Sequence, residues 1–183
     1  MDRLPMLWGA SPEEAGRHYP ADDLVPGALL LTRAIGVAAP PALTWRWLCQ
    51  IAVAPYSYDW VDNRGRRSPD ALTPGAERLE LGQPMAEIFR LTSYDDGHHW
   101  TALTSPRGQR LFGPVAITYA AEPDGPGSRI VCRLAVGVDG PLSRLRAHVL
   151  AWGDLVMMRR QLLNLRALAE RDAGVQAAAA LLV

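Results

Sequence analysis

The densest group of side chains that could do chemistry is the segment YSYDW at 56–60. Tyr58 and Trp60 carry amphipathic rings that can contact an apolar ligand and hydrogen-bond to its polar end. Asp59 can act as an acid, a base or an orienting group. The alternative is structural, with Trp60 closing an open end of a sheet and Asp59 capping a short helix. Tyr58 and Asp59 are therefore candidate catalytic residues, and Tyr58 and Trp60 are candidate ligand contacts.

A second candidate for proton transfer is His98, because histidine titrates near neutral pH. His98 and His99 are adjacent, and neighbouring side chains of a strand point to opposite faces of the sheet. At most one of them can therefore face an interior. If Trp100 faces inward, His98 does too, which makes Trp100 a candidate ligand contact. The alternative is a histidine at the surface.

Arg33 lies in an apolar strand-like segment and shares a face with Leu31. If that face is the inner one, the guanidinium must pair with a carboxylate or receive a polar group of a ligand. Glu87 and Asp59 are conceivable partners. The alternative is an edge position from which the guanidinium reaches solvent.

Two later segments supply further candidate ligand contacts. Tyr119 lies two residues after Ile117 and therefore shares its face of the expected strand. Its hydroxyl either faces an interior or hydrogen-bonds across the sheet. In the last segment, apolar residues recur at steps of three and four, which is typical of one face of a helix. On this face Val149, Trp152 and Val156 are expected to contact the sheet or a ligand.

These candidates need a scaffold, and the periodicity predicts one of the α+β class. The expected strand at 28–37 runs into a helix that begins at the proline pair before Ala42. Short connectors rich in Gly, Pro and Asp separate a series of alternating segments, as in an antiparallel meander. The expected elements are a strand at 28–37, helices at 41–53 and 57–63, strands at 85–92, 98–104, 110–121 and 128–138, and a helix at 142–171.

Composition excludes several functions. The chain has 183 residues, 49% of them hydrophobic, which suits one domain. Its net charge is zero, so nucleic acid is not an expected partner. Every basic residue is arginine, which removes Schiff-base chemistry, pyridoxal phosphate attachment and a Walker-type phosphate loop. No metal-ligand spacing is present, and neither a metal nor another cofactor is expected.

The remaining features concern compartment and domain limits. Cys49 and Cys132 lack any CxxC context and are expected to be reduced core thiols, which fits a cytoplasmic protein. The abundance of Ala, Arg, Pro and Gly suggests a bacterial source. No window is apolar enough for a membrane helix, so no membrane insertion is expected. We divide the chain into an N-terminal arm at 1–26, a domain at 27–172 and a tail at 173–183. The sequence is compatible with a homodimer.

Four segments, in this order, resemble stretches of actinobacterial proteins of the START-related, Bet v 1-like superfamily, also called SRPBCC or polyketide cyclase-like proteins. The resemblance covers about residues 20–172 and is carried by LVPGALLLTRAIGVAAPPALTWRWLCQ at 24–50, YSYDWVDN at 56–63, SRIVCRLAV at 128–136 and GDLVMMRRQLLNLRALAER at 153–171. It implies the helix-grip fold, in which a curved antiparallel sheet wraps around a long C-terminal helix and encloses a cavity.

The resemblance leaves three functions open, because a fold alone does not select one. The first is binding of a small hydrophobic molecule, lipid-like or polyketide-like, in the cavity. The second is a cofactor-independent cyclase or dehydratase acting on such a molecule by acid and base chemistry. The third is a partner-binding domain whose core is filled.

Overall fold

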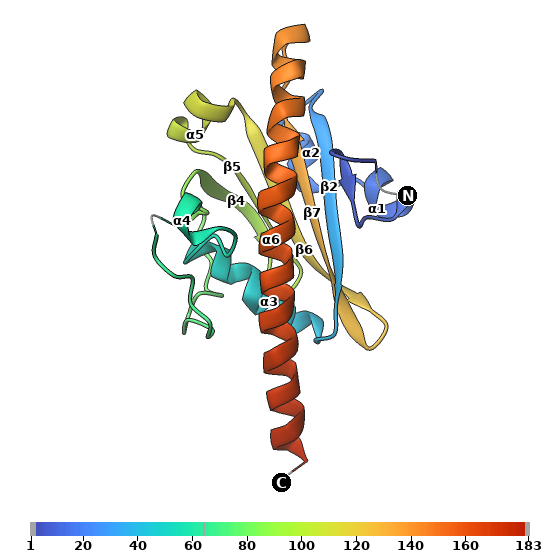
Figure 1. Ribbon diagram of the computed structural model, residues 1–183, viewed down its shortest axis with the longest axis vertical. Helices are drawn as coiled ribbons and strands as arrows, with labels where there is room; N and C mark the ends of the chain where they lie inside the picture. Colours follow the sequence, from blue (N-terminus) through green and yellow to red (C-terminus); the bar gives the residue numbers. More distant parts are fainter. Residues whose placement is uncertain (1–2, 64, 182–183) are drawn as a thin grey trace.

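The computed structural model describes residues 3–63 and 65–181 and shows an α+β fold built on one curved sheet (Figure 1). The strand order is β1-β2-β7-β6-β5-β4-β3. All neighbours pair antiparallel except β1, which runs parallel to β2. The strands are β1 Leu7–Trp8, β2 Leu29–Val37, β3 Pro84–Met85, β4 Phe89–Asp95, β5 His99–Thr104, β6 Val115–Asp124 and β7 Gly127–Val136.

Short helices precede and follow β2, and one long helix ends the fold. α3 and the 3-10 turn after it form the helix expected at 41–53, and α4 lies inside the segment expected at 57–63. The helices are α1 Pro12–Gly16, α2 Pro20–Leu24, α3 Pro41–Cys49, α4 Asp59–Asp62, α5 Pro106–Phe112 and α6 Pro141–Ala180, and the 3-10 turn η1 spans Gln50–Ala52. Cys49 and Cys132 are both buried free thiols. The helix-grip expectation is confirmed.

The strand expected at 110–121 was wrong in its first residues, which belong to α5. Ser105 caps this helix by accepting a hydrogen bond from the backbone N–H of Gly108 at 3.2 Å, and Pro106 occupies its first position. Gly113 ends it with a left-handed φ of 80°. The Pro-Arg-Gly connector is therefore a helix start, and β6 begins only at Val115.

α6 crosses the inner face of the sheet and extends beyond it at both ends (Figure 1). Its 40 residues correspond to about 60 Å at a rise of about 1.5 Å per residue. The helix continues past Arg171, where the sequence pattern suggested its end. No helix in the described parts of the chain is apolar enough over sufficient length to cross a membrane.

The apolar face that α6 turns to the sheet differs from the one expected. Trp152 and Val156 have 53% and 55% of their surface exposed, so the expectation that they contact the sheet or a ligand was wrong. Val149 has 67% of its surface exposed but lies beside the space between α6 and the sheet. The inward face of α6, which packs against β2, carries three alanines among larger residues. The buried residues of α6 are Ala147, Ala151, Leu155, Met158, Gln161, Leu162, Leu165 and Ala169.

The segment that contains α1 and α2 covers the opposite face of the sheet. In α2, the backbone N–H of Ala21 donates to the hydroxyl of Thr118 at 3.0 Å. Arg133, only 1% exposed, donates from its guanidinium to the backbone carbonyl of Arg17 at 2.7 Å. The guanidinium of Arg133 also lies over the ring of Tyr19, 5.1 Å from its centre. This face is therefore filled, and any internal space must lie on the side of α6.

Candidate functional site

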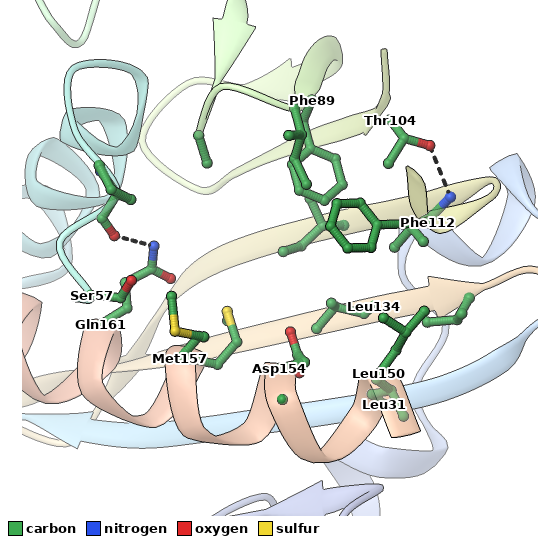
Figure 2. A pocket seen from close by; sticks show the side chains of 18 of the residues that line it. Leu31, Ser57, Phe89, Thr104, Phe112, Leu134, Leu150, Asp154, Met157 and Gln161 are labelled. Carbon is green, nitrogen blue, oxygen red and sulfur yellow. Dashed lines mark hydrogen bonds between the residues drawn. The ribbon is translucent and has the colours of Figure 1, made fainter. Parts of the chain in front are cut away.

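A cavity of about 540 Å³ separates the inner face of the sheet from α6 (Figure 2). Its wall is predominantly apolar. The strands contribute Leu31, Phe89, Trp100, Val115, Ile117, Tyr119, Leu134 and Val136, and α6 contributes Val149, Leu150, Gly153, Asp154, Met157, Met158 and Gln161. Both the size and the composition are typical of pockets that bind small molecules.

The cavity reaches the surface between α5, α6 and the turn before β4. Phe112 of α5, Val149 of α6 and Glu87 of the turn all line the cavity and are exposed. Ala86 and Glu87 adopt left-handed backbone conformations, with φ of 42° and 60°. Residues other than glycine pay a small energetic cost there, and such conformations are concentrated at functional sites. We define this opening as the mouth of the cavity.

A buried ion pair lies beneath the cavity wall. Arg33 of β2 is 0% exposed, and its Nη2 lies 3.0 Å from Oδ2 of Asp154 on α6. The same guanidinium donates to the carbonyl of Met6 at 2.8 Å and to that of Ala151 at 3.4 Å. Arg33 thus faces inward and pairs with a carboxylate, as one of its two interpretations expected. The partner is Asp154 and neither Glu87 nor Asp59.

The second oxygen of Asp154 is available to a ligand. Oδ1 has no hydrogen-bond partner among the described residues, and Figure 2 shows a carboxylate oxygen of Asp154 pointing into the cavity. The side chain is 20% exposed, and the exposed part belongs to the cavity wall. Burial raises the pKa of Asp154 to about 6, although the charge and hydrogen bond of Arg33 act in the opposite direction. The cavity wall therefore presents one carboxylate oxygen, Oδ1 of Asp154, that has no partner among the described residues and lies among mainly apolar side chains.

This raised pKa predicts a pH dependence of stability. The ordinary pKa of an aspartate is 3.8, so between about pH 4 and pH 6 the folded state holds more protons at Asp154 than the unfolded state. The contribution of Asp154 to the free energy of unfolding is fully present below that window and is lost as the pH rises through it. We expect the free energy of unfolding of the wild type, relative to Asp154→Asn, to fall by about 2 to 3 kcal/mol across the window.

Urea unfolding at a series of pH values measures this difference. Asp96→Asn is the matched control, because Asp96 is exposed at a turn and has no ion pair among the described residues. Parallel pH profiles of the wild type and Asp154→Asn would show that Asp154 titrates normally and would remove the argument for a desolvated carboxylate.

A second polar group in the wall is satisfied by the protein itself. The hydroxyl of Tyr119 donates to Oε1 of Gln161 and lies 3.1 Å from the sulfur of Met158. Nε2 of Gln161 donates in turn to the carbonyl of Pro55 at 2.5 Å. Burial raises the pKa of the Tyr119 hydroxyl well above its usual value. Tyr119 and Gln161 therefore join β6, α6 and the segment after η1, and they form a structural part of the wall.

Several residues proposed from the sequence lie at the cavity and others lie away from it. Trp100, Tyr119 and Val149 line it. Trp100 is 1% exposed, packs against the ring of Tyr119 at 4.6 Å between centres and donates from its indole to the carbonyl of Leu48 at 3.2 Å. Trp152 and Val156 face outward. The structure therefore brings three of the candidate ligand contacts, Trp100, Tyr119 and Val149, to the cavity wall.

The YSYDW segment does not contribute its expected groups to the wall. Trp60 is 79% exposed, so it neither contacts the cavity nor closes the sheet. The carboxylate of Asp59 accepts hydrogen bonds from the backbone N–H of Ser68 at 2.9 Å and from its hydroxyl at 2.6 Å. Burial alone would raise the pKa of Asp59, but these bonds to Ser68 lower it below its usual value. Asp59 thus organises a loop, and only Ser57 of this segment lines the cavity, while Tyr58 does not.

His98 lies in the turn before β5 and is exposed, while His99 is half-buried at the start of the strand. Neither belongs to the cavity wall in the described residues. The argument that His98 follows Trp100 inward was wrong because the strand begins only at His99. A turn residue does not obey the alternation of a strand.

Sequence reasoning missed Asp154 and Gln161. One signal was present for Asp154, which is the only acidic residue between Pro141 and Ala169 in the final helix. No comparable signal marked Gln161. Among the described residues, no group of three His, Cys, Asp or Glu side chains is arranged to hold a metal ion.

Comparison with solved structures finds several proteins that are similar to this chain. A protein from Mesorhizobium loti is 14% identical, with a TM-score of 0.50 over 78% of this chain and 97% of that chain. A protein from Thermus thermophilus is 15% identical, with a TM-score of 0.50 over 79% and 99%. The di-domain ARO/CYC StfQ from the steffimycin biosynthetic pathway is 14% identical, with a TM-score of 0.49 over 84% and 53%.

At these identities, the likeness concerns the fold alone. No protein-family model matches the sequence, and the comparison with curated proteins finds no match. The chain shares its helix-grip fold with the Mesorhizobium loti and Thermus thermophilus proteins.

Proposed function

We propose that this protein binds a small, largely apolar molecule in the cavity between the sheet and α6. The observation that carries the proposal is the cavity itself, about 540 Å³ in volume and walled by aliphatic, aromatic and methionine side chains. A space of this size between packed layers costs stability, because the side chains around it lose contacts. A ligand would restore those contacts by burying its own apolar surface.

The chemistry of Asp154 narrows the ligand class. Oδ1 of Asp154 can only accept a hydrogen bond while the group is ionised, and it has no partner in the described residues. A ligand with a hydroxyl or amine at one end would satisfy this oxygen while its apolar part contacts Leu134 and Met157. We therefore propose an apolar molecule that carries one hydrogen-bond donor.

The wall favours binding over the two alternatives. A cyclase or dehydratase needs at least two polar groups that converge on the ligand, and the hydroxyl of Tyr119 is already committed to Gln161. A partner-binding domain with a filled core would have no chamber at all, and this cavity argues against it.

The direct test is a binding measurement with a neutral apolar probe, N-phenylnaphthylamine, whose fluorescence rises in an apolar environment. We expect saturable binding to the purified protein at one site. Native mass spectrometry of protein purified from its own host should show a retained small molecule that denaturation releases. Absence of saturable probe binding together with an empty protein would contradict the proposal.

Replacing Asp154 with Asn tests the donor preference. The amide oxygen of Asn can keep the hydrogen bond from Arg33, which places the amide NH2, a donor, toward the cavity. In competition with the probe, we expect the wild type to bind naphthol about tenfold more tightly than methoxynaphthalene, which cannot donate. Asp154→Asn should remove this preference.

Met157→Leu is the matched control, since it alters the same wall without changing its polarity. It should retain the preference for naphthol. Equal preference in Asp154→Asn and the wild type would show that Asp154 does not contact the ligand, while probe binding itself would still report on the cavity.

A further inference from the structure

The outer face of the first half of α6 is both apolar and basic. Leu142, Leu145, Val149, Trp152 and Val156 follow one another at steps of three and four and are 53% to 81% exposed. Arg144, Arg146, Arg159 and Arg160 lie on the same half of the helix and are exposed. We call these nine residues the outer face of α6. An apolar stripe flanked by arginine, with a tryptophan within it, is the pattern of helices that lie in the surface of a membrane.

The four arginines of this face have no acidic partner among the described residues. None of the four has an ion pair within the described residues, whereas Arg17, Arg33, Arg129 and Arg133 all do. The single acidic residue in this half of the helix, Asp154, turns inward to Arg33. Although the net charge of the chain is zero, the outer face of α6 therefore carries a local excess of positive charge.

α5 extends this surface to the mouth of the cavity. Leu111 and Phe112 are 53% and 36% exposed, and Arg107 and Arg110 are exposed on the same short helix. The guanidinium of Arg146 donates to the carbonyl of Leu111, so the two helices are in direct contact. α5 and the first turns of α6 lie at the same end of the molecule (Figure 1).

The apolar stripe is also continuous with the cavity wall. Val149 belongs to the stripe and lines the cavity, and Phe112 lines it from the side of α5. A partner that covers the stripe would therefore border the mouth. For an apolar ligand, entry from a lipid phase at this point avoids passage through water.

We propose that the outer face of α6, together with Leu111 and Phe112 of α5, docks on the surface of an anionic lipid bilayer. The apolar side chains enter the headgroup region and the arginines pair with lipid phosphates. A second copy of the chain fits less well, because a two-fold pairing of this face would bring arginines against arginines. Nucleic acid also fits less well, because its phosphates would leave the apolar stripe uncovered.

Vesicle sedimentation tests the proposal without any cavity ligand. We expect the protein to bind vesicles made of equal parts phosphatidylcholine and phosphatidylglycerol, and to bind pure phosphatidylcholine vesicles at least tenfold more weakly. Raising the salt concentration should weaken binding to the mixed vesicles. Arg144→Gln combined with Arg160→Gln should reduce that binding by about tenfold, as should Leu145→Gln combined with Trp152→Gln.

Arg78→Gln combined with Arg90→Gln is the matched control, since it removes the same charge from outside α5 and α6. This control should bind as the wild type does. Equal loss in control and test variants, or no binding to either vesicle, would overturn the proposal. So would a dimer in sedimentation equilibrium that Leu145→Gln dissociates, since the face would then be covered by a second copy. Probe binding is measured separately, so a failed ligand assay would leave this result unaffected.

Discussion

Replacing Arg33 with Met is expected to lower the free energy of unfolding by about 3 to 5 kcal/mol at neutral pH. The substitution preserves an unbranched side chain of similar length but removes the charge that faces Asp154 at 3.0 Å. It also removes the donors to the carbonyls of Met6 and Ala151. A carboxylate left in the cavity wall without its cation must be either desolvated or protonated, and both cost free energy.

A second substitution distinguishes the effect of breaking the ion pair from the effect of losing the packing of the Arg33 side chain. Arg33→Met combined with Asp154→Leu removes both charges, and we expect it to recover most of the lost stability. Arg90→Met is the control for removing an arginine from a strand, because Arg90 is exposed on β4. Urea unfolding measures all four proteins. If Arg33→Met were as stable as Arg90→Met, the ion pair would contribute nothing to the fold.

Ile117→Trp is expected to weaken binding of N-phenylnaphthylamine at least about a hundredfold. Ile117 lines the cavity from β6 and is 4% exposed, so a larger ring at this position extends into the chamber. The ring then occupies the volume that the probe needs. Because the chamber has room for the ring, the cost in stability should stay below about 1.5 kcal/mol, in contrast to overpacking of a filled core.

Ile117→Leu is the matched control, because it keeps the number of carbon atoms and should bind the probe as the wild type does. Fluorescence titration gives the affinities, and circular dichroism confirms that each variant is folded. Unchanged affinity in Ile117→Trp would place the probe outside this cavity and would remove the main support for the proposed function.

Periodicity identified the secondary structure of this chain better than it identified the direction of side chains. The three- and four-residue steps of the last segment correctly predicted a helix, yet Trp152 and Val156 point to solvent. α6 has a second series of residues, including Ala147 and Ala151, that forms the buried face. Alanine contributes little to a hydrophobic pattern, but its small side chain lets a helix lie close to a sheet. The phase of the helix therefore depends on the sheet beneath it.

The candidate site was predictable only in part, for a similar reason. The alternation in β5 and β6 made Trp100 and Tyr119 candidate ligand contacts but left their direction open, and both line the cavity. The partner of Arg33 could not be identified, because Asp154 is 121 residues away along the chain. Its proximity depends on how α6 crosses β2. The prediction that His98 faces inward was wrong because β5 begins one residue later than the pattern suggested.

The position of Arg33 connects two parts of the molecule that are otherwise remote. One guanidinium holds both the carbonyl of Met6, beside the N-terminal strand β1, and the carboxylate that faces the cavity. A change in the charge of Asp154 would alter the strength of its ion pair with Arg33, and with it the hydrogen bond from Arg33 to Met6. If a ligand binds at Asp154, we therefore expect occupancy of the cavity and attachment of the N-terminal segment to be thermodynamically linked, and such a linkage is reciprocal. We accordingly expect proteolytic cleavage near the amino terminus to change the affinity of the cavity for its ligand.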